Sequence, residues 1–340
     1  MADVDLAQLR ADALGGDARA LCALGKRLVL GGGVRPSPLE GVEFLKQAHA
    51  GGDGEAAALM ARFAAWGVLR APNRNEALDL LALAAERGWV SSQEELRFLA
   101  REGGSDWKAL RARIDLGDLC ASPPKRAVSE SPRVRHIENF ATPAECDRLI
   151  ALASGAMRPA QVYRGSAELQ MSGDRTNSEA DFVIGCADVA LSLICQRIAS
   201  AVGIPPIYFE VAKLLHYEVG QQFAMHGDFL ELATPEQRAE VERRGQRVAT
   251  VLIYLNDDFE GGETEFARGA RHAPRKGDAL AFVNVTPSGA PDYESLHAGL
   301  APTRGEKWLF SQWIRSKPVN AFATPGPLPG ELDPAWREKF

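Results

Sequence analysis

Apolar residues recur at helical spacing through the first third of the chain, and their pattern repeats. Leu21, Leu24 and Leu28 lie on one face of a predicted helix. A shift of 36 residues places the segment 15–17 (Gly-Gly-Asp) on an identical segment at 51–53. A repeat of roughly 20 to 50 residues is typical of an α-solenoid. We therefore expect pairs of helices, each pair joined by a glycine-containing turn.

The repeating segment is expected to form an N-terminal helical domain over residues 1–117. Two units are clear, and a third begins near Arg87 and loses the pattern by about residue 103. The register of small and apolar residues resembles the Sel1-like branch of the tetratricopeptide repeats. That resemblance implies an α-solenoid that binds proteins on its concave surface. A helical cap that only packs against the next domain is an equally open interpretation.

Residues 118–132 contain three prolines and three serines, so we expect a linker there. Beyond it the pattern changes to short apolar runs separated by glycine and proline, beginning with a strand at 134–137. Thr142 and Glu145 form a capping-box pattern that opens a helix ending near Ala153. Further strands are expected at 208–217, 247–255, 279–283 and 307–314. This succession predicts mostly antiparallel β structure with flanking helices, as in a sandwich or jelly roll.

Two further segments interrupt or follow these strands. Thr234, the proline after it and Gln237 predict a helix that runs to about Arg244 and stops at Gly245. This helix is expected to be either a lid or a solvated surface helix. The proline- and glycine-rich tail at 318–340 is expected to lie extended on the surface or to be mobile.

Composition narrows the class of protein. The chain has 340 residues, of which 46% are hydrophobic and 25% charged, as in a globular protein of about two domains. The net charge of -6 argues against general nucleic-acid binding. We expect no secretory signal and no membrane span. Five cysteines without a C-x-x-C pair argue against a disulfide framework, so a cytoplasmic location is expected.

The candidate chemistry begins with a histidine and an aspartate two residues apart. On a strand, His226 and Asp228 point to the same face, so an imidazole and a carboxylate can reach one ion. A third ligand must come from elsewhere, and His297 is a candidate. Two histidines and one carboxylate form the facial triad of non-haem Fe(II) oxygenases. Lys307, ten residues later, would need an anion if it pointed into a barrel, and a dicarboxylate cosubstrate would supply one.

Four segments around these residues form an ordered series. They are 216–228 (HYEVGQQFAMHGD), 247–264 (RVATVLIYLN, then GGET), 276–282 (KGDALAF) and 295–314 (SLHAG, then KW to WI). In this order they resemble the Fe(II)- and 2-oxoglutarate-dependent dioxygenases, specifically the prolyl 4-hydroxylase-like branch. The resemblance covers roughly residues 133–317.

This resemblance implies a fold, a cofactor set and a reaction. The fold would be a double-stranded β-helix, or jelly roll, with His226, Asp228 and His297 as iron ligands. The distal carboxylate of 2-oxoglutarate would meet Lys307. Fe(II), 2-oxoglutarate, O₂ and ascorbate are the implied cofactors and cosubstrates, and the reaction is hydroxylation of an unactivated C–H bond with release of succinate. The residues implied to bind the cosubstrate are Lys307, Tyr217 and Thr250.

The family's substrate contacts are carried over to four residues. Arg175, in the segment Asp-Arg-Thr-Asn, would hold a peptide carbonyl or carboxylate with its planar fork. Trp313 would suit the flat ring of proline. Glu210 matches the family's glutamate, although pairing between Glu210 and Arg175 as a structural bridge stays open. Phe223 stands where the family has a second tyrosine, so the hydroxyl donor is lost and the contact to a proline peptide is in doubt.

The sequence thus predicts an α-solenoid joined to a jelly-roll dioxygenase that hydroxylates a prolyl residue of a protein or peptide, as procollagen-proline 4-dioxygenases do. The helical repeats would help to recruit the substrate protein. Two alternatives stay open. One is hydroxylation of another residue or of a free small molecule, and the other is a non-catalytic binding protein whose barrel is a relic.

Overall fold

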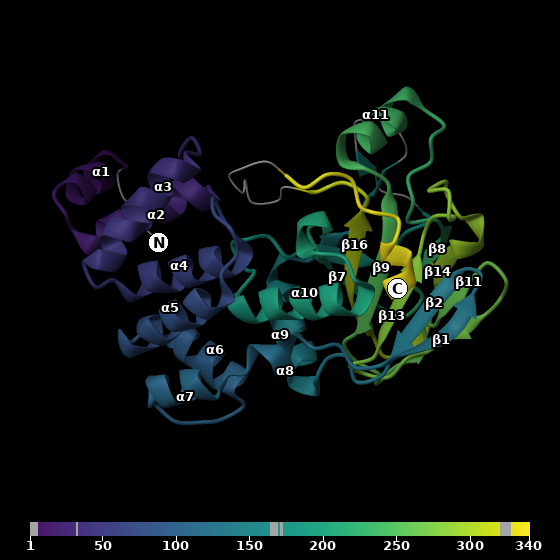
Figure 1. The fold of residues 1–340 in the computed structure, drawn as a ribbon, viewed down its shortest axis with the longest axis horizontal. Coiled ribbons are helices and arrows are strands. Elements are labelled where there is room, and N and C mark those ends of the chain that lie inside the picture. Colours follow the sequence, from purple (N-terminus) through teal and green to yellow (C-terminus); the bar gives the residue numbers. More distant parts are fainter. Residues whose placement is uncertain (1–5, 32, 164–168, 171–172, 320–327) are drawn as a thin grey trace. The chain divides into compact units, whose positions relative to one another are not determined.

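Helical hairpins build the N-terminal part of the computed structural model, which describes residues 6–31, 33–163, 169–170, 173–319 and 328–340. The helices, coloured purple to blue in Figure 1, are α1 (Leu6–Leu14), α2 (Ala18–Leu30), α3 (Pro38–Ala50), α4 (Gly54–Trp66), α5 (Arg74–Glu86), α6 (Val90–Ala100), α7 (Trp107–Arg113) and α8 (Leu116–Cys120). The predicted repeat is visible in the N-caps of α2 and α4. Asp17 and Asp53, which are 36 residues apart, each accept a hydrogen bond from the third backbone amide of the helix that follows.

Glycines allow the first pair of repeat helices to pack closely. A Cβ on Gly25 of α2 would lie 2.7 Å from the carbonyl oxygen of Gly41 of α3, and the reverse contact is equally short. Both positions therefore need glycine for the backbones to touch. Gly67 ends α4 in the left-handed conformation, with a φ of 73°.

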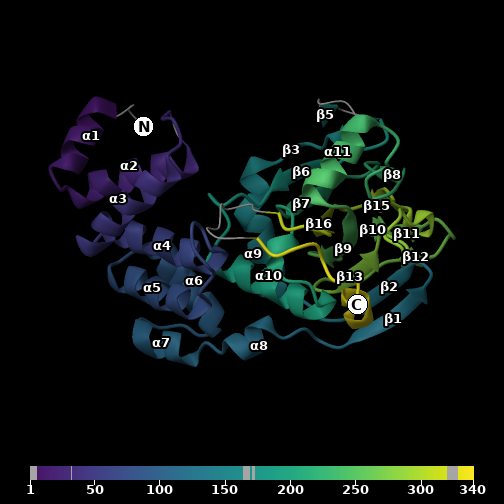
Figure 2. The same cartoon turned by 45° about the horizontal axis from the view of Figure 1, so that its top comes forward.

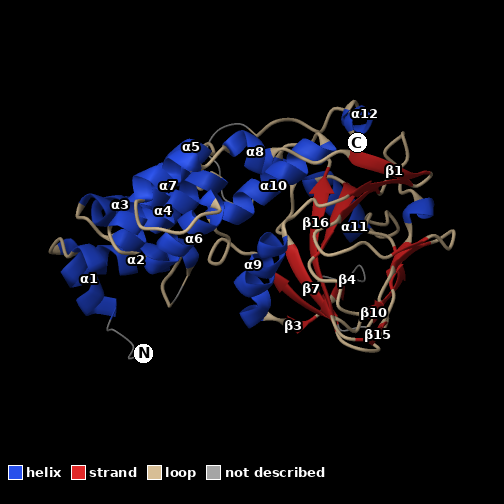
Figure 3. Ribbon diagram, turned by 90° about the horizontal axis from the view of Figure 1, so that it is seen from below, coloured by secondary structure: helices blue, strands red, loops and turns tan. Residues whose placement is uncertain are grey.

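The chain divides into two compact units. Of the described residues, those up to Leu119 together with Ala187–Leu193 form the first unit, and the others form the second. The strands, red in Figure 3, belong to the second unit. Part of the segment expected to be a linker is a strand instead, because β1 (Lys125–Glu130) pairs antiparallel with β2 (Arg133–Ile137).

Within the described part of the chain, an eight-stranded and a four-stranded antiparallel sheet dominate the second unit, as expected for a jelly roll. Among the described residues, eight strands form the larger sheet in the order β1-β2-β13-β9-β16-β7-β6-β3. Besides β1 and β2 it contains β3 (Arg158–Pro159), β6 (Ser178–Asp181), β7 (Lys213–Tyr217), β9 (Arg247–Tyr254), β13 (Ala279–Val283) and β16 (Lys307–Arg315). The strand expected from residue 208 thus begins only at Lys213, since prolines 205 and 206 start a 3₁₀ turn at Pro206–Tyr208.

The smaller sheet carries strands from the second half of the chain. Its four strands lie in the order β12-β11-β14-β8, and Figure 2 labels β8, β11 and β12 together with the paired strands β10 and β15. The bounds of these four strands are β8 (Phe223–His226), β11 (Thr264–Phe266), β12 (Arg271–His272) and β14 (His297–Gly299). Two separate strand pairs are β10 (Glu260–Gly261) with β15 (Pro302–Arg304) and β4 (Val162–Tyr163) with β5 (Leu169–Gln170).

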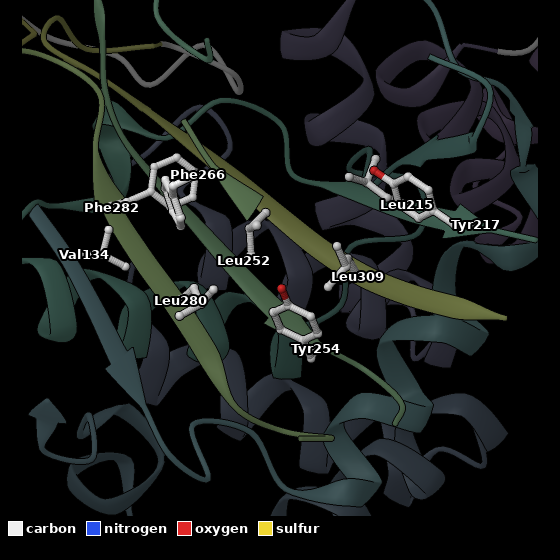
Figure 4. Close-up of a cluster of buried hydrophobic side chains, with 9 residues drawn as sticks. All are labelled: Val134, Leu215, Tyr217, Leu252, Tyr254, Phe266, Leu280, Phe282 and Leu309. Carbon is white, nitrogen blue, oxygen red and sulfur yellow. The ribbon is translucent and has the colours of Figure 1, made fainter. Parts of the chain in front are cut away.

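The core of this unit consists of residues that alternate along the strands. Leu280 and Phe282 on β13 point inward, and Phe266 of the smaller sheet meets Phe282 edge-on, with ring centroids 5.3 Å apart. Figure 4 shows the cluster, which contains Val134, Leu215, Tyr217, Leu252, Tyr254, Phe266, Leu280, Phe282 and Leu309. Since residues i and i+2 share a face, the same alternation determines which polar side chains enter the interior.

The predicted capped helices are both present. α9 (Pro143–Ala153) opens with a capping box of Thr142 and Glu145, and α11 (Pro235–Arg244) with one of Thr234 and Gln237. No residue of α11 is buried, as expected for a helix that stands out in solvent. The remaining helix of this region is α10 (Val189–Val202).

The end of the chain corrects the prediction of an extended or mobile tail. Residues 320–327 lie outside the described part, but α12 (Trp336–Lys339) follows them, and both Trp336 and Phe340 are buried. Their rings pack with centroids 5.8 Å apart, and Arg135 donates to the carbonyl of Phe340. Two aromatic side chains provide enough apolar area to fix this end. None of the described helices combines the length and the apolarity that crossing a bilayer requires.

Candidate metal centre

Strand register brings the two histidines together. In the smaller sheet, β8 pairs antiparallel with β14, and His226 and His297 are Cα partners in that pairing. Asp228 follows β8 and lies with one carboxylate oxygen 3.6 Å from Nε2 of His226 and the other 3.7 Å from Nε2 of His297. One candidate ligand atom from each of the three residues lies within 4.8 Å of the others. The three side chains therefore form a compact donor set.

Backbone carbonyls orient both imidazole rings. Nδ1 of His226 lies 2.8 Å from the carbonyl of Ala224, and Nδ1 of His297 lies 3.1 Å from the carbonyl of Ser295. A proton on Nδ1 satisfies each carbonyl and leaves the lone pair on Nε2, the atom that faces Asp228. Burial, followed by the neighbouring His226, lowers the pKa of His297 to about 4, so this ring is neutral near pH 7.

Asp228 is held ionised although it is buried. Burial alone raises the pKa of this carboxyl, but His297, His226 and the hydroxyl of Thr250 outweigh it and hold the pKa well below its usual range. The Oγ1 of Thr250 donates to Oδ2 of Asp228 at 2.6 Å. Two imidazole nitrogens and one carboxylate match the donor chemistry of a non-haem Fe(II) site.

Lys307 is a buried cation that forms no salt bridge among the described residues. Its side chain is fully buried on β16, and Nζ donates to the carbonyl of Gly262 at 2.6 Å. The ring centroids of Tyr217 and Tyr254 lie 5.2 and 5.3 Å from Nζ, and the charge of Glu263 only partly offsets the effect of burial on the pKa of Lys307. Burying an ammonium group is costly unless an anion accompanies it. The site is therefore suited to a ligand that brings a negative charge.

The protonation of Lys307 leads to a prediction about stability. Burial lowers the pKa of Lys307 from 10.5 to about 7, whereas the unfolded chain keeps the ordinary value. At a pH between these two pKa values, Lys307 is more often protonated in the unfolded state than in the folded state. Raising the pH therefore increases the free energy of unfolding of the wild-type protein. We expect the wild-type protein, free of ligands, to gain stability relative to Lys307→Met between about pH 7 and about pH 9, by a few kcal/mol. Denaturant unfolding of both proteins measures this, and a constant difference would contradict the assignment.

A cavity connects the three metal-site residues with Lys307. Its lining includes Tyr217, His226, Asp228, His297, Lys307 and Trp313. Tyr217 is the Cα partner of Lys307 where β7 pairs with β16, so these two side chains enter the cavity next to each other. The donor set and the unpaired cation thus face one space.

Arg175 and Phe223 form one wall of this cavity. The guanidinium carbon of Arg175 lies 4.6 Å from the ring centroid of Phe223, and that ring stacks on His226 with centroids 3.4 Å apart. Arg175 is buried, and its Nη2 forms an ion pair of 2.8 Å with Glu179. The proposed structural bridge between Arg175 and Glu210 is therefore wrong, since Glu179 takes that place.

Glu210 lies away from the cavity lining. Register places Arg247 of β9 opposite Arg315 of β16, and the carboxylate of Glu210 accepts from both, at 2.7 and 2.5 Å. Burial raises the pKa of Glu210, but the two arginines lower it to about 2. A carboxylate between two cations neutralises them, which explains why Glu210 is held between these two strands.

Trp313 lines the cavity, and Arg247 packs against its ring. The guanidinium carbon of Arg247 lies 3.8 Å from the ring centroid of Trp313, within cation–π range. The indole Nε1 is buried and has no hydrogen-bond partner among the described residues. Buried donors are normally satisfied, so this N–H is available to an acceptor that enters the cavity.

Thr250 has a different position from the one expected. It is fully buried on β9, its hydroxyl faces Asp228, and it does not line the cavity. Asn284 donates from Nδ2 to the same hydroxyl at 2.9 Å, a contact that the sequence analysis missed. The signal was present, because Asn284 continues the inward-facing alternation of Leu280 and Phe282 as a polar residue.

Comparison with known proteins identifies related sequences. The model of the 2OG-Fe(II) oxygenase superfamily matches residues 212–315. Probable prolyl 4-hydroxylase 4 of Arabidopsis thaliana is 32% identical over 236 residues, which cover 62% of this chain and 77% of the relative. Prolyl 4-hydroxylase 2 of the same plant is 34% identical over 212 residues, covering 56% of this chain and 69% of the relative.

Among solved structures, the viral collagen prolyl hydroxylase of Paramecium Bursaria Chlorella virus-1 is 26% identical, with a TM-score of 0.43. The match covers 55% of this chain and 98% of the viral protein.

Proposed function

Because the chain belongs to the 2OG-Fe(II) oxygenase superfamily, in its prolyl 4-hydroxylase family, we propose that it hydroxylates a prolyl residue of a protein or peptide. The observation that carries the proposal is the shared cavity, in which the donor set of His226, Asp228 and His297 faces the unpaired cation of Lys307. In the overall reaction, O₂ and 2-oxoglutarate are consumed, one oxygen atom enters the C–H bond and the other enters succinate, and CO₂ leaves.

The residues fit the implied metal and cosubstrate. His226, Asp228 and His297 would hold Fe(II), with Nε2 of each ring as the ligand atom. When bound, Fe(II) and 2-oxoglutarate supply the oxidising power for C–H hydroxylation. The protein's part is to hold these groups and to exclude water, which the burial of Asp228, His297 and Lys307 favours.

Lys307 is assigned to the distal carboxylate of 2-oxoglutarate. Its ammonium group would exchange the carbonyl of Gly262 for a charged acceptor and so recover the cost of burial. Tyr217, the neighbouring residue in the register, would flank the same carboxylate. Thr250 acts on Asp228 and is not assigned to the cosubstrate.

We assign the direct substrate contact to Trp313 and give supporting parts to Glu210, Arg175 and Phe223. The unpaired indole N–H would donate to a carbonyl oxygen of the peptide, while the ring face opposite Arg247 would meet the proline ring. Glu210 holds Arg247 behind this ring. Arg175, held by Glu179, stacks on Phe223 and so keeps that ring against His226.

A substrate panel tests this function. We expect prolyl peptides, with Fe(II), 2-oxoglutarate and ascorbate, to raise succinate release at least about tenfold over the peptide-free rate and to gain one oxygen atom on proline. His226→Ala should abolish both signals. Trp313→Phe keeps the ring but removes the N–H, so it should raise the KM for peptide while succinate release without peptide stays unchanged.

Other results would favour the alternatives. Turnover of free proline or of another residue, with prolyl peptides inert, would support a different substrate class. A folded, iron-loaded protein that releases no succinate with any member of the panel would support the non-catalytic relic.

We also propose that the helical unit, residues 1–117, recruits protein substrates. Its support is a cavity of about 390 Å³ within that unit, whose lining includes Arg19, Glu55, Arg87 and Trp89. Arginine and tryptophan are among the residues enriched at protein–protein interfaces. A kcat/KM that is higher for a protein substrate than for the same sequence as a short peptide would support recruitment, and equal values would support a unit that only braces the barrel.

A further inference from the structure

Two buried polar side chains form a series of hydrogen bonds that leads to the carboxylate of the candidate metal centre. Asn284 donates from Nδ2 to Oγ1 of Thr250 at 2.9 Å, and Thr250 donates to Oδ2 of Asp228 at 2.6 Å. We propose that this relay positions Asp228 for metal binding, so that Thr250 and Asn284 are positioning residues of the centre. The inference rests on the proposed function only in taking Asp228 as a metal ligand.

The chemistry of the three groups determines the direction of the relay. The hydroxyl of Thr250 donates to Oδ2 of Asp228, so its single proton points to the carboxylate. The lone pairs of Oγ1 then require a donor, and Asn284 must present its NH₂ group. With the amide turned over, two acceptor oxygens would face each other.

Asn284 keeps this orientation at a cost. Its side chain is fully buried, and its Oδ1 has no hydrogen-bond partner among the described residues. A buried acceptor left unpaired costs roughly 1 to 3 kcal/mol. The amide of Asn284 donates to Thr250 although its own oxygen stays unpaired. This indicates that the hydrogen bond to Thr250 is the contact that the surrounding structure preserves.

The relay is anchored in the larger sheet. Thr250 and Phe282 are Cα partners where β9 pairs with β13. Just beyond that pair, the amide of Asn284 donates to the carbonyl of Val248 at 2.9 Å, and its carbonyl accepts from the amide of Asp292 at 3.0 Å. The backbone of Asn284 is thus fixed on both sides. Asp228, by contrast, belongs to the chain that leaves β8 of the smaller sheet, so the relay connects it to the other sheet.

The contact differentiates the two oxygens of Asp228. Oδ2 accepts the hydroxyl of Thr250, while Oδ1 faces Nε2 of His226 at 3.6 Å and receives no hydroxyl or amide among the described residues. A hydrogen bond on one oxygen orients the carboxylate and leaves the other oxygen to a cation. The relay therefore favours a single oxygen of Asp228 as ligand, which keeps the remaining positions of the metal open.

Affinity for Mn(II) alone tests the relay without turnover. Titration of the full-length, metal-free protein, followed by the electron paramagnetic resonance signal of free Mn(II), measures the Kd. Thr250→Val keeps the branched shape and removes the hydroxyl, so we expect the Kd to rise roughly 10- to 100-fold. Thr250→Ser keeps the hydroxyl and should stay within about threefold of wild type. Asn284→Leu should fall between the two.

A matched control separates the relay from a general loss of stability. Thr264 is also buried, and its hydroxyl is bonded to Tyr254 instead of Asp228, so Thr264→Val should leave the Kd for Mn(II) unchanged. If Ser weakens binding more than Val at position 250, packing and not the hydroxyl matters, and the relay is refuted. Wild-type affinity in Thr250→Val would also refute it, even if Asp228→Ala no longer binds. Equal affinity of wild type and Asp228→Ala would instead refute the metal centre itself.

Discussion

Replacement of Asp228 by alanine is expected to abolish metal binding and turnover while the fold survives. The carboxylate is the negative member of the donor set, and no other carboxylate of the described residues belongs to that set. Its removal leaves two imidazoles, so the centre loses a negative charge as well as one of three ligands. We expect succinate release to fall at least about 1,000-fold, equivalent to ~4 kcal/mol. Coupled assays of succinate, together with the Kd for Mn(II), measure both effects.

The stability of the Asp228→Ala protein distinguishes loss of chemistry from loss of fold. A buried carboxylate is costly to desolvate, so its removal is expected to change the free energy of unfolding by no more than about 1 to 2 kcal/mol in the metal-free protein. Asp278 is a matched control, because it is also buried but accepts from backbone amides at Asn139 and Arg275. Asp278→Ala should destabilise the protein and leave the Kd for Mn(II) intact. Normal turnover by folded Asp228→Ala would contradict the assignment.

Replacement of Lys307 by methionine is expected to separate stability from cosubstrate binding. Methionine fills a similar volume without a charge, and among the described residues the buried ammonium donates to the backbone carbonyl of Gly262 and forms no salt bridge. We expect the metal-free protein to gain roughly 1 to 4 kcal/mol near pH 7. The KM for 2-oxoglutarate should rise roughly 100- to 1,000-fold, because a buried ion pair with the cosubstrate is lost, while the Kd for Mn(II) changes little.

Lys213 provides the opposite case on the neighbouring strand. It forms ion pairs with Glu179 at 2.9 Å and with Asp181 at 2.8 Å, so Lys213→Met removes one cation from two buried or partly buried carboxylates, which keep only Arg158 and Arg175 as cationic partners among the described residues. This variant should be less stable than wild type, whereas Lys307→Met should be more stable. Thermal unfolding of the three proteins compares them. A destabilised Lys307→Met with an unchanged KM for 2-oxoglutarate would show that Lys307 has only a structural role.

The metal-site residues were accessible to sequence reasoning because local rules place them. A period of two brings His226 and Asp228 to one face, and an inward position for Lys307 follows from the apolar alternation of its strand. Capping boxes likewise predicted the starts of α9 and α11. The partnership with His297 needed the family resemblance, because it depends on the pairing of β8 with β14, about seventy residues apart.

Two predicted site residues have contacts that the sequence analysis did not anticipate, and both cases share a physical cause. Glu210 was assigned to substrate because nothing local shows that Arg247 and Arg315 would become partners across two strands and require an anion between them. Thr250 was assigned to the cosubstrate for the same reason, since Asp228 lies on the other sheet. Long-range register determines which charges and hydroxyls meet, and a local pattern contains no information about it.

Anomalous diffraction from crystals grown anaerobically with Mn(II) and 2-oxoglutarate tests the central claim most directly. The account predicts one strong anomalous peak at bonding distance from Nε2 of His226, Nε2 of His297 and an oxygen of Asp228, with the distal carboxylate of the keto acid on Nζ of Lys307 in place of the Gly262 carbonyl. A peak elsewhere, or a lysine that keeps the Gly262 carbonyl while the keto acid binds away from it, would contradict the account.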